Sequence, residues 1–265
     1  MRLFSEGDFR WELNLRRGDA EAFFAPAAVS KELLTEKQRW LDESSKLYLA
    51  ETSRAQPLVS ELWDLALSWR HVSVPDARSR DLRELARRWE PDLLLMDRET
   101  LSVAAGCVCF PSSWDLRRAI GRRVSDVHEI VPRLNHQVGP QIERFLTQLQ
   151  PGKAFCRENW SLTRTSDRNY HPALQRCRLD DAVTIQELHL RVEQQVFTAL
   201  HSGLLMGIRI AICPLKDLAA IPQVWRNFRD KLRTMPDDVA IYKSMHAARG
   251  RIIHEMDRFE SSLDG

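Results

Sequence analysis

The chain has 265 residues, which suits one large domain or one domain that carries helical extensions. Apolar residues make up 43% of it, so the composition predicts a packed core and excludes a disordered chain. The 39 lysines and arginines nearly balance the 37 aspartates and glutamates. This balance disfavours a nucleic-acid-binding protein, which needs a concentrated basic face. The arginines within 117–123 are expected to form the solvated face of a helix.

Neither a membrane span nor a signal peptide is expected. The longest apolar candidate, 204–215, is interrupted by Gly207 and Arg209, and a span needs roughly 18 apolar residues. The N-terminal sequence MRLFSEGDFRWEL carries acids where a signal peptide would be apolar, so we expect a cytoplasmic protein. The five cysteines fit that compartment. Cys107 and Cys109 could bind a metal as a C-x-C pair, but we favour buried, inert thiols.

The first 90 residues have helical spacing and carry no concentration of catalytic residue types. Apolar residues recur at intervals of three and four in 30–41, 57–72 and 81–89, which predicts three helices. Helical spacing returns in 216–263. We therefore predict an N-terminal helical extension over 1–90, a core over 91–215 and a C-terminal helical extension over 216–265, together forming one compact body.

The core is predicted to contain five strands. They are short apolar segments bounded by polar or proline residues, at 92–97, 102–110, 154–163, 185–198 and 204–213. The sequence His201-Ser202-Gly203 predicts a turn that makes the last two strands an antiparallel hairpin.

Helical segments are predicted between the second and third strands. A helix beginning near Trp114 extends to Val124, a proline-containing connector follows over 127–140, and a second helix covers 142–149. Two strands, a helical insertion and three strands give an α+β fold with a five-stranded antiparallel sheet. This order resembles the PAS arrangement, in which a ligand is enclosed between the helical insertion and the sheet.

The motifs of common nucleotide-binding sites and hydrolases are absent from the sequence, and the eight histidines have no zinc-ligand spacing. These absences favour haem or a metal as the ligand. His128 lies at the junction of the predicted helix and the connector, beside Val127 and Ile130. A single imidazole in apolar surroundings is what a five-coordinate haem iron requires. The alternative is a histidine that is simply part of the core.

Polar residues interrupt two of the predicted strands. Alternation places Arg157 and Asn159 on one face of their strand and Glu158 and Trp160 on the other. In the next strand, Arg191 and Glu193 share a face. Inward-facing charges are costly unless they are paired, so these residues are candidates for a site. A solvent-facing ladder of ion pairs is an equally valid interpretation.

Six segments together resemble the haem-dependent oxidative N-demethylase family, and they occur in the same order over about residues 40–245. They are VCFPSSWDL (108–116), DVHEIVP (126–132), VGPQIERFLTQL (138–149), RENWSL (157–162), LRVEQQVFTALHSGLLMGIRIAICPL (190–215) and PDDVAIYKSM (236–245).

This resemblance implies a PAS-like subunit that binds haem b and uses O₂ and reducing equivalents to oxidise a small secondary amine such as dimethylamine, releasing an aldehyde. Its residue patterns imply His128 as the axial ligand of the haem iron and Trp160 as a further cofactor-binding residue. They also imply Arg157, Asn159 and Arg191 as hydrogen-bond donors to dioxygen, and Glu193 as the anchor of a substrate ammonium or a proton relay. No flavin or Fe–S motif is visible, so electrons are expected from a separate flavin/Fe–S reductase that uses NADPH.

The sequence departs from the family pattern along the segments expected to shape the pocket. Glu129 and Ile130 follow His128, QQVF stands at 194–197 where the family has RQTL, and the residues around His201 also differ. The substrate is therefore not assumed to be dimethylamine. The alternative function is a non-catalytic haem-binding PAS sensor of gases or ligands, and a haem-free assembly module is a third. We favour the enzyme because a sensor normally feeds an output domain, and none is expected here.

Overall fold

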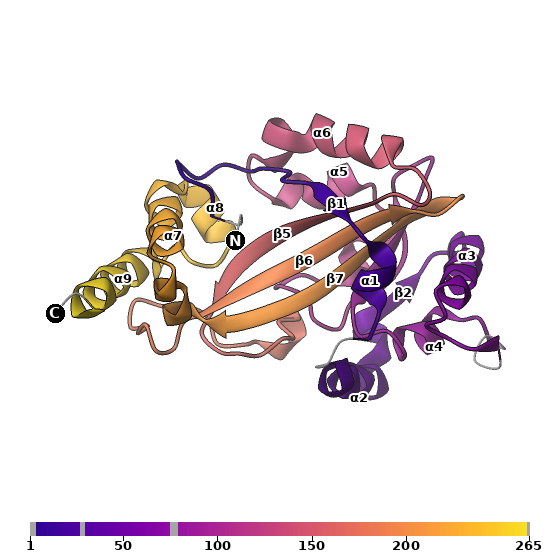
Figure 1. Ribbon diagram of the computed structural model, residues 1–265, viewed down its shortest axis with the longest axis horizontal. Coiled ribbons are helices and arrows are strands. Elements are labelled where there is room, and N and C mark those ends of the chain that lie inside the picture. Colours follow the sequence, from indigo (N-terminus) through magenta and orange to yellow (C-terminus); the bar gives the residue numbers. More distant parts are fainter. Residues whose placement is uncertain (1–3, 27–29, 75–78, 264–265) are drawn as a thin grey trace.

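The structure is a computed structural model, and it describes residues 4–26, 30–74 and 79–263 (Figure 1). Seven strands form one antiparallel sheet in the order β1-β5-β6-β7-β3-β4-β2. The strands are β1 (Arg16–Gly18), β2 (Leu49–Glu51), β3 (Asp92–Asp97), β4 (Val103–Cys107), β5 (Ala154–Thr163), β6 (His189–Ala199) and β7 (Gly203–Pro214). The predicted α+β class is confirmed.

Nine α-helices and four short 3₁₀ helices occur in the described residues. The α-helices are α1 (Ala20–Phe24), α2 (Ser30–Tyr48), α3 (Ala55–Ser68), α4 (Leu82–Ala86), α5 (Val124–Val127), α6 (Leu134–Gln148), α7 (Pro222–Thr234), α8 (Asp237–Tyr242) and α9 (Arg249–Leu263). The 3₁₀ helices are η2 (Leu116–Arg118), η3 (His128–Ile130), η4 (Pro172–Leu174) and η5 (Leu215–Ala220).

The sheet has seven strands, so the prediction of five was wrong. The two additional strands, β1 and β2, are three residues long and come from the segment that was expected to be only helical. Each lies at an edge of the sheet, where it pairs with β5 or β4. A strand this short has no alternation to detect, and only its backbone pairing defines it.

The predicted hairpin at 201–203 is confirmed. Strands β6 and β7 pair from His189↔Pro214 to Ala199↔Leu204, which gives the longest ladder of the sheet. The prediction that β6 begins at Ile185 was wrong, because the strand starts at His189. The Ile185 backbone N–H instead donates to Glu255 Oε2 in α9, at 3.0 Å.

The two faces of the sheet bury different sets of helices. On one face, Leu58 of α3 and Leu85 of α4 pack with Leu95 of β3 and Leu205 of β7. On the opposite face, α6 places Phe145 against Phe155 and Phe197, with ring centroids 5.5 and 5.7 Å apart. Figure 1 shows α5 and α6 together along one side of the long strands, while α7, α8 and α9 gather at one end.

The single helix predicted from Trp114 to Val124 was wrong. Only η2 and α5 are helical in that region, and Gly121 between them has a φ of +77°. The Gly121 N–H donates to the Val103 carbonyl at 2.8 Å, and the Val103 N–H donates to the Arg122 carbonyl at 3.0 Å. Pairing with the start of β4 therefore replaces the intrahelical hydrogen bonds. The arginines are exposed, as expected, but they do not lie on one helix.

The second predicted helix is longer than expected, because α6 begins at Leu134 and includes Pro140. Cys107 and Cys109 are both buried with free thiols, as expected, and their Sγ atoms are 3.9 Å apart. Among the helices of the described residues, none has the length and apolar character to cross a membrane.

Candidate functional site

The pairing of β5 with β6 brings four predicted site residues onto one face of the sheet. Asn159 lies opposite Glu193, and Arg191 lies opposite Ser161, two residues further along the same face. Arg157 is a diagonal neighbour of Glu193, because it pairs with Gln195. Side chains at opposite positions have Cβ atoms about 5 Å apart, and diagonal neighbours remain within reach of long side chains. Phe155 and Phe197, which contact α6, lie on this same face, so these residues face the helical insertion.

Glu193 is buried and is held by two hydrogen bonds. The Ser112 hydroxyl donates to Glu193 Oε1. The Gln195 amide donates to Glu193 Oε2 at 3.1 Å. Both carboxylate oxygens thus have a partner, as a buried charge requires. The position of the carboxylate is therefore fixed by the protein itself.

Arg191 is fully buried and is committed to the protein's own acceptors. Its Nε donates to Ser112 Oγ at 2.7 Å, and its terminal nitrogens donate to the carbonyls of Phe110 and Arg168, both at 2.6 Å. Because the Ser112 hydroxyl accepts from Arg191, its own proton is directed to Glu193. Arg191 therefore positions Glu193 through Ser112.

Arg157 differs from Arg191 in its partners. Its Nε is shielded from solvent, and none of the described residues accepts a hydrogen bond from it. Burial lowers the pKa of the Arg157 guanidinium, an effect that the charge of Glu193 opposes. A buried donor without an acceptor is costly and rare in native proteins. The guanidinium is consequently available to a bound ligand.

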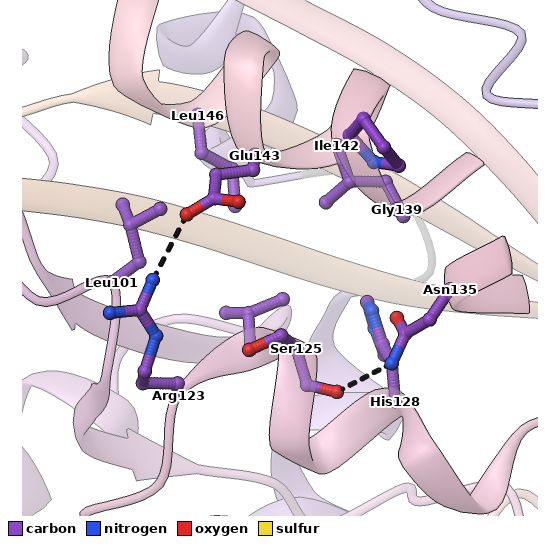
Figure 2. Close-up of a pocket in the computed structure, with 11 residues that line it drawn as sticks. Leu101, Arg123, Ser125, His128, Asn135, Gly139, Ile142, Glu143 and Leu146 are labelled. Atoms are coloured by element: carbon purple, nitrogen blue, oxygen red, sulfur yellow. Dashed lines mark hydrogen bonds and ion pairs between the residues drawn. The ribbon is translucent and has the colours of Figure 1, made fainter.

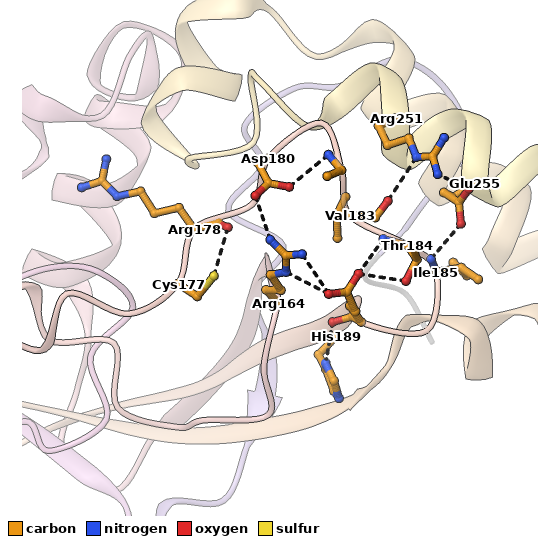
Figure 3. Close-up of polar contacts among 12 residues, drawn as sticks. Arg164, Cys177, Arg178, Asp180, Val183, Thr184, Ile185, His189, Arg251 and Glu255 are labelled. Atoms are coloured by element: carbon orange, nitrogen blue, oxygen red, sulfur yellow. Dashed lines mark hydrogen bonds and ion pairs between the residues drawn. The ribbon is translucent and has the colours of Figure 1, made fainter.

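His128 begins η3 and lines a pocket of about 270 Å³ between the α5–η3 segment and α6. Burial, followed by the charge of Arg157, lowers the pKa of His128 to about 4. The imidazole is therefore neutral at physiological pH, the form in which histidine binds metal ions. Figure 2 shows the His128 side chain at one end of the pocket, beside Asn135.

The pocket has an apolar lining and a polar rim. Its apolar side chains include Leu101, Val124, Ile142 and Leu146. At the rim, Arg123 forms an ion pair of 2.9 Å with Glu143, and the Asn135 amide donates to the Ser125 carbonyl at 2.8 Å (Figure 2).

Trp160 lies on the face of β5 opposite to Arg157 and Asn159, as alternation predicts. Its ring packs against Phe4 and Phe228, with centroids 5.4 and 5.0 Å away, and only 8% of the residue is exposed. The structure thus separates Trp160 from the face that carries the other candidates, and its side chain belongs to the core under the C-terminal helices.

Lys243, which follows α8, was not predicted as a site residue. Its ammonium donates to the Trp160 carbonyl at 2.6 Å and lies 4.6 Å from the centroid of the Trp160 ring. Burial lowers the pKa of Lys243 to about 8; the charge of Glu193 opposes this shift, and that of Arg157 adds to it. The ammonium is therefore close to both charged groups of the sheet.

Ser112 and Gln195 were also missed by the sequence analysis. Gln195 could have been found, because it shares the alternating face of Arg191 and Glu193. Ser112 and Lys243 fall in segments quoted for the family resemblance, but they are about 80 and 50 residues from Glu193 in the chain. Only the tertiary structure brings them to it.

The structure thus defines an α+β protein in which a neutral histidine and a buried acid–base cluster lie on the helical-insertion side of one sheet. Comparison with known families identifies it further. The sequence model of the family "haem-dependent oxidative N-demethylase, alpha subunit-like" matches residues 67–253, well over half of the chain. The chain belongs to this family.

The residues around His128 fit a haem iron ligand. The imidazole is neutral, no hydrogen bond joins its ring to another described residue, and apolar side chains form the pocket beside it. The orphaned Nε of Arg157 adds a donor on the same side of the sheet. Pockets for drug-sized ligands usually measure roughly 300–1,000 Å³, so a pocket of about 270 Å³ holds only part of a porphyrin.

Proposed function

We propose that the protein is a haem-dependent oxidoreductase that uses O₂ to oxidise a small amine, in the manner of an oxidative N-demethylase. The observation that carries this proposal is the neutral imidazole of His128 in an apolar pocket, in a chain that belongs to a haem-dependent family. Oxidation at the carbon beside nitrogen and hydrolysis of the product would release an aldehyde.

The order of the strands supports a PAS-like core that encloses the cofactor. Without the two edge strands, the sheet has the order β4-β3-β7-β6-β5. In chain order these are the second, first, fifth, fourth and third strands, and α5 and α6 are inserted between the second and the third. This order agrees with the one expected of a PAS-like core and so supports the proposal, and the insertion packs on the face that carries Glu193.

His128 would hold the iron of haem b, and Arg157 and Asn159 would face the reacting groups. When bound, haem supplies the iron centre for the reaction of O₂ with the amine. Arg157 and Asn159 have donors on the helical-insertion face and would stabilise negative charge that develops there. Arg191 would act through Ser112 and Glu193, because its guanidinium donates to Ser112 and two backbone carbonyls.

Glu193 would hold the substrate ammonium or take a proton from it. Its carboxylate is buried, and the Ser112 hydroxyl and the Gln195 amide fix its orientation. A general base must be held within hydrogen-bond reach of the proton that it accepts, and this arrangement provides a fixed acceptor. The amine would therefore bind over the β6 strand.

Electrons would come from a separate flavin/Fe–S reductase that uses NADPH, and we propose a cytoplasmic location for both proteins. The family is named for an alpha subunit, which supports an enzyme of more than one subunit. The sequence contains no glycine-rich dinucleotide motif and no C-x-x-C pair.

The proposal is tested by spectroscopy and product analysis of the purified protein. We expect a Soret band after expression with a haem supply, and aldehyde when an amine, O₂ and a limited amount of dithionite are present. A Soret band without aldehyde for a panel of methylated amines would favour the haem sensor. The absence of haem binding would reject the proposal.

A further inference from the structure

The cluster around Glu193 contains more positive than negative charge. Arg157, Arg191 and Lys243 contribute three cations. The charge of Glu193 acts on all three, and the other carboxylate that acts on Arg191, Asp92, is itself paired with Lys37 at 3.3 Å. A partly buried site with unbalanced charge is costly unless a counter-charge binds there.

The three cations are not equivalent. Arg191 is stabilised by hydrogen bonds to Ser112 and two backbone carbonyls, and its ring contact with Tyr170 has a distance of 5.7 Å. Arg157 has no such acceptor among the described residues, and its Nε is buried. The unbalanced charge therefore resides at Arg157 rather than at Arg191.

Lys243 reaches the same region from the C-terminal segment. Its ammonium donates to the carbonyl of Trp160, one residue beyond Asn159. The ring of Trp11, with a centroid 5.4 Å away, and the ring of Trp160 flank the ammonium. An ammonium has three N–H donors, and among the described residues only one of them is used by a hydrogen bond to a carbonyl, since the two aromatic rings are cation–π contacts. Lys243 can therefore donate a hydrogen bond to a ligand while it keeps its contacts with Trp11 and Trp160.

The segment that carries Lys243 is attached to the helical insertion. Asp238 of α8 forms an ion pair of 2.8 Å with Arg133, the residue before α6. This contact links the C-terminal segment, which carries Lys243, to α6, the helix that forms one wall of the His128 pocket.

We propose that Arg157 and Lys243 form a carboxylate-binding pair. This inference rests on the proposed function and specifies its ligand. A planar guanidinium and an ammonium are the donors that bind carboxylates most strongly, through charge-assisted hydrogen bonds. The carboxylate has two possible sources with the same chemistry: a propionate of the haem, or an acidic group on the amine substrate, as in an N-methylated amino acid.

The first arm of the test concerns the haem propionates. Soret titrations compare haemin with haemin dimethyl ester, which lacks both charges, in Arg157→Gln and Lys243→Gln. If a propionate is the ligand, each substitution weakens haemin binding roughly 10- to 100-fold and leaves the ester unaffected. The matched control is Lys216→Gln, which changes a half-buried lysine that contacts Gln186 and should bind both forms like the unmodified protein.

The second arm concerns the substrate. Calorimetry compares N,N-dimethylglycine with dimethylamine on the protein as purified, with or without haem. If the pair binds a substrate carboxylate, both substitutions weaken dimethylglycine binding roughly 10- to 100-fold more than they weaken dimethylamine binding, and they do not alter haemin affinity. Circular dichroism excludes unfolded variants.

The inference is overturned if folded variants retain the affinity of the unmodified protein for haemin and for dimethylglycine. Failure of the proposed function gives a different result, since the unmodified protein would then show either no Soret band or a Soret band without aldehyde formation. In that case, the binding of dimethylglycine to haem-free protein can still be measured, and this measurement tests the pair of Arg157 and Lys243 separately.

Discussion

Glu193 owes its orientation to residues from two other parts of the site. Ser112 lies just after β4 and is itself held by Arg191, whereas Gln195 is a neighbour on the same strand. A carboxylate fixed in this way loses little freedom when it binds an ammonium or accepts a proton. His128 is defined in a different manner: its ring has no hydrogen-bond partner among the described residues, and apolar side chains form part of the pocket that it lines.

Replacement of His128 by alanine is expected to remove the Soret band or shift it strongly, because the axial ligand would be lost. Far-UV circular dichroism should remain almost unchanged, since the residue lies in a short 3₁₀ helix at a pocket wall. His136→Ala is the matched control, because that histidine is exposed and lies in the neighbouring helix α6. An unaltered spectrum in His128→Ala would identify another histidine as the ligand, with His189 the next to test.

Glu193→Gln keeps the shape of the side chain but removes its charge, so haem content should persist while turnover falls. A decrease of roughly 10- to 1,000-fold is expected for the loss of a positioned base or ammonium anchor. Ser112→Ala should lower turnover less, because the Gln195 bond to Glu193 remains. Full activity in Glu193→Gln, measured as aldehyde formation under a fixed supply of reductant, would show that the carboxylate has no part in the reaction.

At the scale of elements, a single carboxylate attaches the central hairpin to helix α3. Glu61 accepts hydrogen bonds from the backbone N–H groups of His201 and Ser202, and from Nδ1 of His201 at 2.8 Å and Oγ of Ser202 at 2.6 Å. These hydrogen bonds keep the pKa of Glu61 below its ordinary value, against the effect of burial. The turn is thereby tied to a helix 140 residues earlier in the chain.

The depressed pKa of Glu61 gives a pH dependence of stability with a defined sign. A carboxyl whose folded pKa is lowered contributes stability above its unfolded pKa and loses it as the pH falls through the folded value. Glu61→Ala is expected to lower the free energy of unfolding by roughly 1.5–3 kcal/mol at neutral pH, the contribution of hydrogen bonds to a charged group. Denaturant unfolding at pH 7 and at pH 3 should show a smaller effect at the lower pH. An equal effect at both values would contradict the assignment to ionised Glu61.

At the scale of the whole molecule, the C-terminal helices do more than extend the core. Helices α7 and α9 bury Trp225, Phe228 and Met256 against the end of the sheet. The short helix α8 between them leads directly into Lys243, at the edge of β5. A segment predicted as an extension thus contributes a charged group to the candidate site.

Catalysis is expected to need electrons from outside the chain. Protein supplied with an amine, O₂ and NADPH should be nearly inactive, because the sequence has no dinucleotide or Fe–S motif that could pass electrons to haem. Addition of a flavin/Fe–S reductase, or of dithionite in limited amount, should restore aldehyde formation. Sustained turnover with amine and O₂ alone would contradict the expectation and indicate an oxidase. Boiled reductase is the control.

The amino-acid sequence by itself determined the five long strands, the hairpin, the helical ends of the chain and the faces of β5 and β6. These features depend on local periodicity, which the chain carries within a few residues of each position. It also singled out His128 by its neighbours Val127 and Ile130, but Ile130 is 65% exposed, and the apolar side chains that line the pocket with His128 include Leu101, Ile142 and Leu146 from other parts of the chain.

Only the tertiary structure decided how these parts form a site. The sequence left open whether Arg157, Arg191 and Glu193 are a surface ladder or a buried cluster, because alternation is the same in both. Burial by the helical insertion, the bonds from Ser112 and the approach of Lys243 all depend on contacts between residues far apart in the chain. The edge strands and the break at Gly121 were undetectable for the same reason, since each is defined by hydrogen bonds to a distant strand rather than by its own residues.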